Sequence, residues 1–430
     1  MPYYGLMNFL AKGSGGGLTE YTINGVQSGT LPLGDYTVDG DIVVLEGASL
    51  TLTAGSIFRN ADNVLWEIQG TLNASGTSGS HITFQKTDAA TQWHGLRFCK
   101  EASAGTGTAT VNTTTNEVSI SGFTRTTNFP TRFTTTGTLP APLEVGARYY
   151  FRSDNTLSRT LGGAAIDITD TGSGTHTIHQ LSPSSSTGLQ STDYDQTNTL
   201  QYCDFSDAKK TNLPSQYTSP PAYRHWVRGG GLMAYQLEDA QFDNLTFTDC
   251  ESYERGGGAY IEGLTTTLVA LNFSDWTFTN CASNAALTEP GGAYGQSHGQ
   301  QTTVLANFTF SGSGSSSVDD YTGGGLAFDA GADTFTFYNA GYVMRNGLSV
   351  RDFKSSGSIP GGLSAATNYY MINVSNDDPT TDYTTCQLSL TPGGSAVNLT
   401  DTGSGTITCD LCIDYYVFDT TISISGFSFS

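Results

Sequence analysis

Acidic side chains gathered in one short stretch are the groups of this chain best suited to chemistry. Asp249, Glu251 and Glu254 lie within six residues, and Glu262 follows eight residues after Glu254. Enzymes that hydrolyse glycosidic bonds use two carboxylates held roughly 5–9.5 Å apart. If this chain is an enzyme, these four residues are its weak catalytic candidates and a polysaccharide is its substrate.

Other charged residues near this stretch would suit a lyase, which abstracts a proton with a base that lies beside a carboxylate. Two more acids and four bases are close in sequence: Asp204, Asp207, Arg224, His225, Arg228 and Arg255. The chain contains no Gly-x-Ser-x-Gly, P-loop, His-Glu-x-x-His or EF-hand motif. We therefore favour the alternative that these groups are surface charges at the corners of a repeated fold.

The cysteines and histidines do not have metal-site spacing, and we expect no metal and no other cofactor. Four of the seven cysteines sit in strand-like phrases, where a buried thiol packs as a small apolar group: Cys99, Cys203, Cys250 and Cys281. The lone Cys409-x-x-Cys412 pattern, with Cys386 nearby, leaves a disulfide, a redox role and a metal open beside simple packing. Four isolated histidines are interpreted as surface or packing residues: His94, His176, His179 and His298.

The acidic stretch lies inside a repeat that must position it. Matching glycines of four clusters lie 27, 34 and 33 residues apart, from Gly229 to Gly256, Gly257 to Gly291 and Gly291 to Gly324. Repeats of this length are typical of stacked units that contact only their neighbours. The glycines indicate corners or places where backbones approach closely.

Between the glycine clusters, apolar residues alternate with Thr, Ser or Asn in related phrases, which is the period of a strand. The phrases are Asn244–Cys250, Asp275–Cys281 and Asn307–Ser311. The alternation predicts a right-handed parallel β-helix, in which Cys250 and Cys281 stack beside Phe247 and Phe278. The same alternation runs through residues 18–109, which we expect to form the first turns.

A second kind of repeat interrupts the first. Residues Phe133–Tyr150 match Phe353–Tyr370 at a constant offset of 220, and Ala165–Thr175 matches Ala396–Thr406 at an offset of 231. The eleven extra residues fall near Asn376–Thr385 and indicate a longer hairpin in the second copy. Two copies of one small antiparallel β module are therefore predicted, and each is inserted into the repeating shaft, because a closed loop tolerates long insertions.

The resulting prediction is an all-β chain, a right-handed parallel β-helix interrupted by two inserted antiparallel modules. Its divisions are an anchor and linker at 1–17, shaft at 18–109, a module at 110–182, shaft at 183–331, a module at 332–412 and terminal shaft strands at 413–430.

The two modules resemble a small β module found repeatedly in tail-fibre, spike and other virion proteins of bacteriophages. The residues that carry the resemblance are Phe133–Leu143, Tyr149-Tyr150 and Asp170–Thr175. The shaft resembles the pectin-lyase-like β-helix of phage tailspikes and surface adhesins. The resemblance implies a structural protein at the virion surface, often a homotrimer, and it supplies no catalytic residues.

Residues 1–17 are interpreted as a tether to another protein, which the resemblance makes another virion protein. A short apolar and aromatic peptide precedes a flexible glycine-rich linker. Its anchoring side chains are Tyr3, Tyr4, Leu6, Met7, Phe9 and Leu10. The segment lacks the basic region and apolar core of a signal peptide, which predicts assembly in the host cytoplasm.

The composition excludes some classes of binding partner. Asp and Glu number 39 against 18 Lys and Arg, a formal net charge of −21, and no cluster of bases is present to bind nucleic acid. No apolar run approaches the length that spans a bilayer, so membrane insertion is not expected. A host-surface glycan remains a possible partner.

The C-terminal strand phrase predicts oligomerisation, because an uncovered end of a parallel sheet invites association. The apolar residues expected at the contacts of a homotrimer are Ile422, Ile424, Phe427 and Phe429. The leading hypothesis is a phage tail spike or fibre, or a capsid-surface fibre or decoration protein, that mediates host attachment or particle assembly. The alternatives are a tailspike-like polysaccharide depolymerase and a bacterial surface adhesin or filament subunit.

Overall fold

The computed structural model describes most of the chain from residue 17 to residue 429. The ranges outside the description are 1–16, 102, 182–188, 191–196, 211–226, 236–239, 254–255, 266–269, 284–292, 300–301, 307–308, 312–313, 316–325, 339–348, 366, 368, 379–382, 392, 413–414, 419–421, 426–427 and 430. The predicted anchor residues therefore lie outside the described part. Within that part there is no α-helix, and no helix long and apolar enough to cross a membrane.

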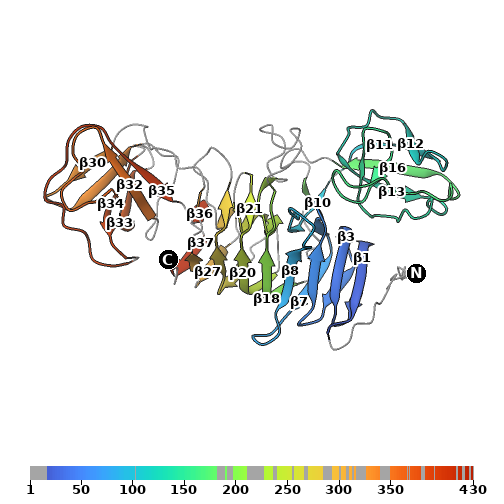
Figure 1. Cartoon of the computed structure of the whole chain (residues 1–430), viewed down its shortest axis with the longest axis horizontal. Helices are drawn as coiled ribbons and strands as arrows, with labels where there is room; N and C mark the ends of the chain where they lie inside the picture. Colours follow the sequence, from blue (N-terminus) through green and yellow to red (C-terminus); the bar gives the residue numbers. More distant parts are fainter. Residues whose placement is uncertain are drawn as a thin grey trace.

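The predicted all-β class is confirmed, and most strands belong to one large sheet. Twenty-one strands of the described ranges form this sheet, and their pairing is parallel throughout. The pairs form three ladders, which we call A, B and C. In Figure 1 the sheet forms the middle of an elongated molecule, with an antiparallel sheet at each end.

Ladder A begins with β1 (Glu20–Val26) and continues through β3 (Asp35–Val44), β5 (Ile57–Asn60), β8 (Ile82–Lys86), β18 (Asn198–Ser206), β20 (Ala240–Thr248), β24 (Thr277–Thr279), β28 (Thr309–Ser311) and β38 (Ser428–Phe429). Ladder B contains β2 (Gly29–Leu31), β4 (Ser49–Leu52), β7 (Thr71–Ser75), the first halves of β18 and β20, β23 (Ala270–Ser274), β27 (Thr302–Ala306) and β37 (Ile422–Ser425).

Ladder C contains the second halves of β1 and β3, then β6 (Trp66–Ile68), β9 (Leu96–Phe98), β19 (Leu232–Tyr235), β22 (Ala259–Thr265), β26 (Ala293–Gly299) and β36 (Tyr415–Phe418). The chain visits the ladders in one fixed order, A then C then B, and returns to ladder A one strand further along. A minor ladder of β21 (Glu251–Ser252), β25 (Ala282–Ser283) and β29 (Gly314–Ser315) runs beside them.

A column of aromatic rings fills the interior beside ladder A. Each ring stacks on the ring of the next strand at centroid distances of 4.9 to 5.3 Å, and none has exposed surface. The column is Tyr36, Phe58, Phe84, Phe205, Phe247 and Phe278. The predicted placement of two thiols is also confirmed: Cys250 Sγ donates to Phe205 O (3.6 Å) and Cys281 Sγ to Phe247 O (3.5 Å), one strand apart. All six described cysteines with placed side chains are buried.

The described glycine clusters, at residues 229–231 and 256–258, mark close approaches of neighbouring backbones, as predicted, whereas Gly291, Gly292 and residues 323–325 lie outside the described part. A Cβ on Gly95 would lie 2.2 Å from Gly230 O, and a Cβ on Gly230 would lie 2.2 Å from Gly257 O. No side chain fits at such distances, so glycines immediately precede three successive strands of ladder C, β9, β19 and β22.

The two repeated segments form six-stranded antiparallel sheets with one common strand order. The first module contains β11 (Ser103–Asn112), β12 (Glu117–Ser121), β13 (Pro130–Thr135), β14 (Tyr149–Phe151), β15 (Leu157–Ser158) and β16 (His176–Leu181). The second contains β30 (Leu326–Asp329), β31 (Thr334–Tyr338), β32 (Ser349–Ser355), β33 (Tyr369–Asp378), β34 (Tyr383–Ser389) and β35 (Ile407–Cys412).

The first sheet has the order β12-β11-β16-β13-β14-β15 and the second β30-β31-β34-β33-β32-β35. If the end strands of each sheet were paired, the two orders would form the same closed cycle of equivalent strands. The cycle is open between β12 and β15 in the first module and between β30 and β35 in the second. In the first module Val118 N donates to Asn155 O (3.0 Å) across this gap. The longer hairpin predicted in the second copy is confirmed, since β33 and β34 extend well beyond β14 and β15.

Both modules interrupt the ladders without disturbing their register, as predicted. Phe84 of β8 stacks on Phe205 of β18 at 5.1 Å although the first module separates them in sequence. A short antiparallel pair, β10 (Lys100–Glu101) with β17 (Leu189–Gln190), joins the two ends of this insertion. The module strands begin at Ser103 and Leu326, ahead of residues 110 and 332, because β11 and β30 carry the same alternation as the shaft strands and the pattern does not mark the change.

We expect Phe247→Ala to lower the free energy of unfolding by about 3–5 kcal/mol, because the ring is buried between Phe205 and Phe278 and its removal leaves a cavity. The matched control is Gln241→Ala on the exposed side of the same strand, expected within about 0.5 kcal/mol of wild type. Denaturant unfolding followed by circular dichroism measures both, and equal midpoints for the two variants would contradict the importance of the column.

Candidate functional site

The predicted catalytic carboxylates lie in different local settings: one at a corner between strands, one in an ion pair and one within a strand of ladder C. Asp249 lies at a corner with φ +54° and accepts a hydrogen bond from Asn280 Nδ2 (3.2 Å). Glu251, in β21, lies 3.8 Å from Lys209 Nζ. Glu262 is in β22 between Tyr235 and Gln296 of the neighbouring strands, and Glu254 lies outside the described residues.

The second acidic group is placed in the same way. Asp204 faces His81, whose Nδ1 lies 3.0 Å from its carboxylate. Asp207 has φ +54°, like Asp249 one strand further along ladder A, and Asn280 follows with φ +51°. Asp and Asn tolerate this left-handed conformation better than other residues with a side chain. The corner geometry therefore accounts for the choice of Asp at 207 and 249.

Of the four predicted bases, the structure describes Arg228. Arg228 is buried, donates a hydrogen bond to Tyr260 OH and lies 4.9 Å from the centre of that ring. Arg224, His225 and Arg255 lie outside the described residues. In the described part of the chain no group of three or more metal-ligating side chains occurs.

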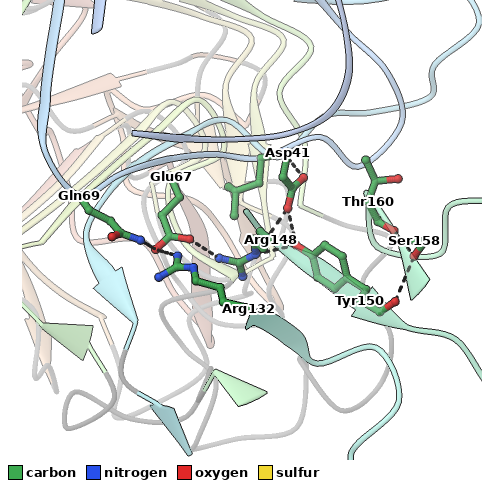
Figure 2. Close-up of polar contacts among 9 residues, drawn as sticks. Asp41, Glu67, Gln69, Arg132, Arg148, Tyr150, Ser158 and Thr160 are labelled. Carbon is green, nitrogen blue, oxygen red and sulfur yellow. Dashed lines mark hydrogen bonds and ion pairs between the residues drawn. The ribbon is translucent and has the colours of Figure 1, made fainter. Parts of the chain in front are cut away.

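A different polar site lies where the first module meets ladder C. Asp41 comes from β3 and Glu67 from β6. Tyr150 comes from β14, Arg148 immediately precedes that strand, and Arg132 comes from β13. Figure 2 shows these side chains pointing toward one another from the two parts of the fold. Asp41, Glu67 and Arg148 are at most 2% exposed.

Hydrogen bonds connect the site into one network. Arg148 Nη1 donates to Glu67 Oε2 (2.7 Å), and Arg148 Nε donates to Tyr150 OH (2.9 Å). Tyr150 OH in turn donates to Asp41 Oδ2 (2.7 Å), while Asp41 Oδ1 accepts from Leu65 N (2.9 Å). Glu67 Oε1 pairs with the Arg132 guanidinium and accepts from Gln69 Nε2 (2.9 Å).

The rest of the contact surrounds this network with polar and apolar groups. Glu144 accepts a hydrogen bond from Val26 N (3.2 Å), and Arg159 Nη1 donates to Asn24 Oδ1 (2.8 Å). Leu65 of the shaft packs with Tyr150 and Leu161 of the module. The shaft thus contributes the central acids and the module the arginines, so the two surfaces are complementary in charge.

The pKa values of the two acids are shifted in opposite directions. Burial raises the pKa of Asp41 from 3.8 to about 7, against the opposing effect of Arg148. Burial would also raise the pKa of Glu67, but Arg132 and Arg148 outweigh it and hold that pKa at about 2. A buried charge is costly unless it is paired, and Glu67 is the better paired of the two.

More buried bases continue along the same side of the shaft. Lys210 Nζ donates to the carbonyls of Arg228 (2.8 Å) and Gly229, and burial lowers the Lys210 pKa well below its ordinary value. Burial, with the nearby charges of Lys210, Arg97 and Arg148, lowers the pKa of His94 to about 3. His94 is therefore a neutral packing residue, one of the two alternatives predicted for it.

This network was missed from the sequence. Glu67 lies in an otherwise apolar strand. Its partners Arg132 and Arg148 come from the first module, and their position depends on how that module folds back onto the shaft. One signal was present: the second copy has Asp352 and Asn368 at the positions of Arg132 and Arg148. A difference between copies at otherwise matching positions indicates that the two copies face different surroundings.

Neither family models nor curated proteins provide a counterpart: no family model matches the chain, and no curated protein does.

We expect Arg148→Met to lower the free energy of unfolding of the docked module by about 3–5 kcal/mol, because it leaves Glu67 buried with one partner fewer. The double variant Arg148→Met with Glu67→Gln removes both charges and should recover part of the loss. Thermal unfolding measures each variant. Additive effects in the double variant would contradict a direct interaction.

The pKa of Asp41 predicts a specific pH dependence. Because its folded pKa is raised, its contribution to stability is fully present below about pH 4 and is lost as pH rises through about 7. Glu67 has a lowered pKa, so its contribution is lost as pH falls from about 4.5 toward 2. Asp41→Asn should remove the decline between pH 4 and 7 and keep the loss in acid. Thermal midpoints measured across this range test it, and parallel curves for wild type and variant would refute it.

Proposed function

We propose that this chain is a structural protein of a bacteriophage virion, a tail spike or fibre or a capsid-surface fibre or decoration protein. The observation that carries the proposal is the continuity of the ladders across two insertions. The stack from Phe84 to Phe205 keeps its 5.1 Å spacing on either side of the first module. A rigid support that holds two copies of one module at its ends suits attachment or assembly at a particle surface (Figure 1).

We further propose that the three ladders wind into a right-handed parallel β-helix. The fixed A–C–B order of the strands supports this, because each circuit advances the chain by one strand in every ladder. Parallel strand connections are right-handed in about 98% of cases. The shaft would then contain a closed interior column of aromatic and aliphatic side chains.

The proposed assembly is a homotrimer in which the last turn contributes contacts. Ile424 lies in register with Leu305, and Phe429 with Phe310, at the final rung of their ladders. Ile422 pairs with Thr303, while Phe427 lies outside the described residues. The resemblance of the modules to those of phage fibre proteins favours three subunits.

The depolymerase hypothesis has less support from the geometry. Three of the candidate acids, Asp249, Glu251 and Asp204, contact Asn280, Lys209 and His81 respectively. Asp207 and Asp249 occupy left-handed corners. Contact with a host-surface glycan remains part of the proposal as binding without cleavage, through the modules or the shaft.

The test compares particles made from the encoding phage genome with particles made from a genome that lacks codons 2–17. We expect the chain in purified wild-type particles, accessible to antibody at the surface, and its loss from the particles of the deletion mutant. The truncated protein should remain folded, because the described strands begin at Glu20. Mass spectrometry and immuno-electron microscopy provide the readouts. Absence of the chain from wild-type particles overturns the function, whereas normal incorporation of the truncated chain overturns only the anchor.

A further inference from the structure

Tyr202 of β18 has a backbone conformation that tyrosine rarely adopts. Its φ is +48°, in the left-handed region, and it lies where β18 passes from ladder B to ladder A. Asn244 and Asp275 hold the equivalent position on the next two rungs, with φ +55° and +59°. Asn and Asp tolerate this conformation, whereas a bulky side chain is disfavoured in it. The backbone of the shaft therefore does not require a tyrosine at this corner.

Strained residues of this kind cluster at functional sites, so the surroundings of the Tyr202 side chain indicate what it does. The side chain is partly exposed, and its ring centroid lies 5.6 Å from that of the His81 imidazole. His81 Nδ1 lies 3.0 Å from each carboxylate oxygen of Asp204. The side chains of His81 and Asp204 are both 35% exposed, so the three groups share one surface that faces solvent.

A projecting turn bounds this surface on the side of β7. Between β7 and β8, Thr77 and Ser80 exchange two backbone hydrogen bonds (3.1 and 3.0 Å), and residues 77–80 are exposed. The turn leaves the sheet beside Tyr202, because Gly76 N donates to Gln201 O (2.8 Å). Figure 1 shows β7, β8 and β18 in the middle of the sheet and apart from both modules. The surface is therefore accessible from outside the shaft.

The three side chains offer the contacts that a sugar ring needs. A pyranose has a face of C–H groups that packs on an aromatic ring, which Tyr202 provides, and hydroxyl groups that donate and accept hydrogen bonds. Each carboxylate oxygen of Asp204 can accept more than one hydrogen bond, so its contact with His81 leaves room for a hydroxyl donor. Because Nδ1 of His81 faces Asp204, Nε2 is the ring nitrogen that can face a ligand.

The surroundings favour an uncharged sugar over an acidic one. Thr83 and Thr246 lie on either side of Asp204 on ladder A and add hydroxyl groups. Asp243 of β20 adds a second carboxylate on the neighbouring strand, and the chain as a whole has a net charge of −21. Negative charge of this kind repels an acidic ligand and leaves the binding of an uncharged one unaffected.

We propose that Tyr202, His81 and Asp204 form a binding subsite for an uncharged pyranose ring of a surface glycan. The inference rests on the attachment role proposed above, and it assigns glycan contact to one corner of the shaft. Contact between the sugar and the ring accounts for a tyrosine at a position where Asn or Asp adopts the backbone conformation more easily.

The first experiment separates this binding role from a role in packing. Tyr202→Asn relieves the backbone as it removes the ring, so its thermal midpoint should lie no more than about 2 °C below that of wild type. Asn244→Tyr is the matched control, because it places a tyrosine in the same conformation one rung further along, and it should lower the midpoint. A larger fall for Tyr202→Asn, or no fall for Asn244→Tyr, overturns the inference.

The second experiment measures binding to the full chain by saturation-transfer NMR. The probes are the methyl glycosides of glucose, galactose, mannose and N-acetylglucosamine, with methyl glucuronide as the acidic comparison. We expect a signal for at least one uncharged probe, its retention in Tyr202→Phe, which keeps the ring, and its loss in Tyr202→Asn.

Three results of the NMR experiment overturn the inference. They are no signal from any uncharged probe, a signal that survives in Tyr202→Asn, and a stronger signal for the glucuronide than for every uncharged probe. Detection of the chain on particles does not depend on these results, so failure of this subsite is distinguishable from failure of the proposed function.

Discussion

The close spacing of neighbouring rungs is the constraint on which the rest of this structure depends. Strands in one parallel sheet lie about 4.8 Å apart, and the interior rings follow at 4.9 to 5.3 Å. Each passage of the chain through the three ladders must therefore return it to the position next to its previous strand, however many residues the connection contains. Glycines at Gly95 and Gly230 and left-handed corners at Asp207 and Asp249 follow from this requirement, because they allow the backbone to bend without disturbing its neighbours.

The same constraint decides where charge is placed. Positions inside the ladders hold apolar side chains, so the buried charges lie on the outer side of ladder C, where Glu67 and Arg97 occupy paired positions. Arginine is suited to such a place because its planar guanidinium bonds several acceptors at once. Arg148 contacts both Glu67 and Tyr150 in this way, and it fixes the orientation of the first module on the shaft.

The repeating elements of the fold could be predicted from the sequence, but the contacts between the first module and the shaft could not. The glycine clusters, the stacking of Cys250 and Cys281, the two copies of the module and the longer second hairpin all follow from patterns that repeat within one sequence. Asp41, Glu67 and Arg148 occur once each, and what brings them together is the way the module folds back onto the shaft. Asp207 and Asp249 show why residue type alone does not assign a role, because the acids that suit left-handed corners are the same types that catalyse glycan cleavage.

The short pair of β10 with β17 has a consequence for how the chain reaches this structure. Pairing of Lys100 with Gln190 closes the first insertion at its base. Before that closure, β18 must find β8 across a long stretch of chain, and contacts so distant in sequence slow folding. A module that folds first and brings residues 100 and 190 together leaves only a short search. The first module would then act during synthesis as a clamp that allows the later rungs to add in order onto those already formed.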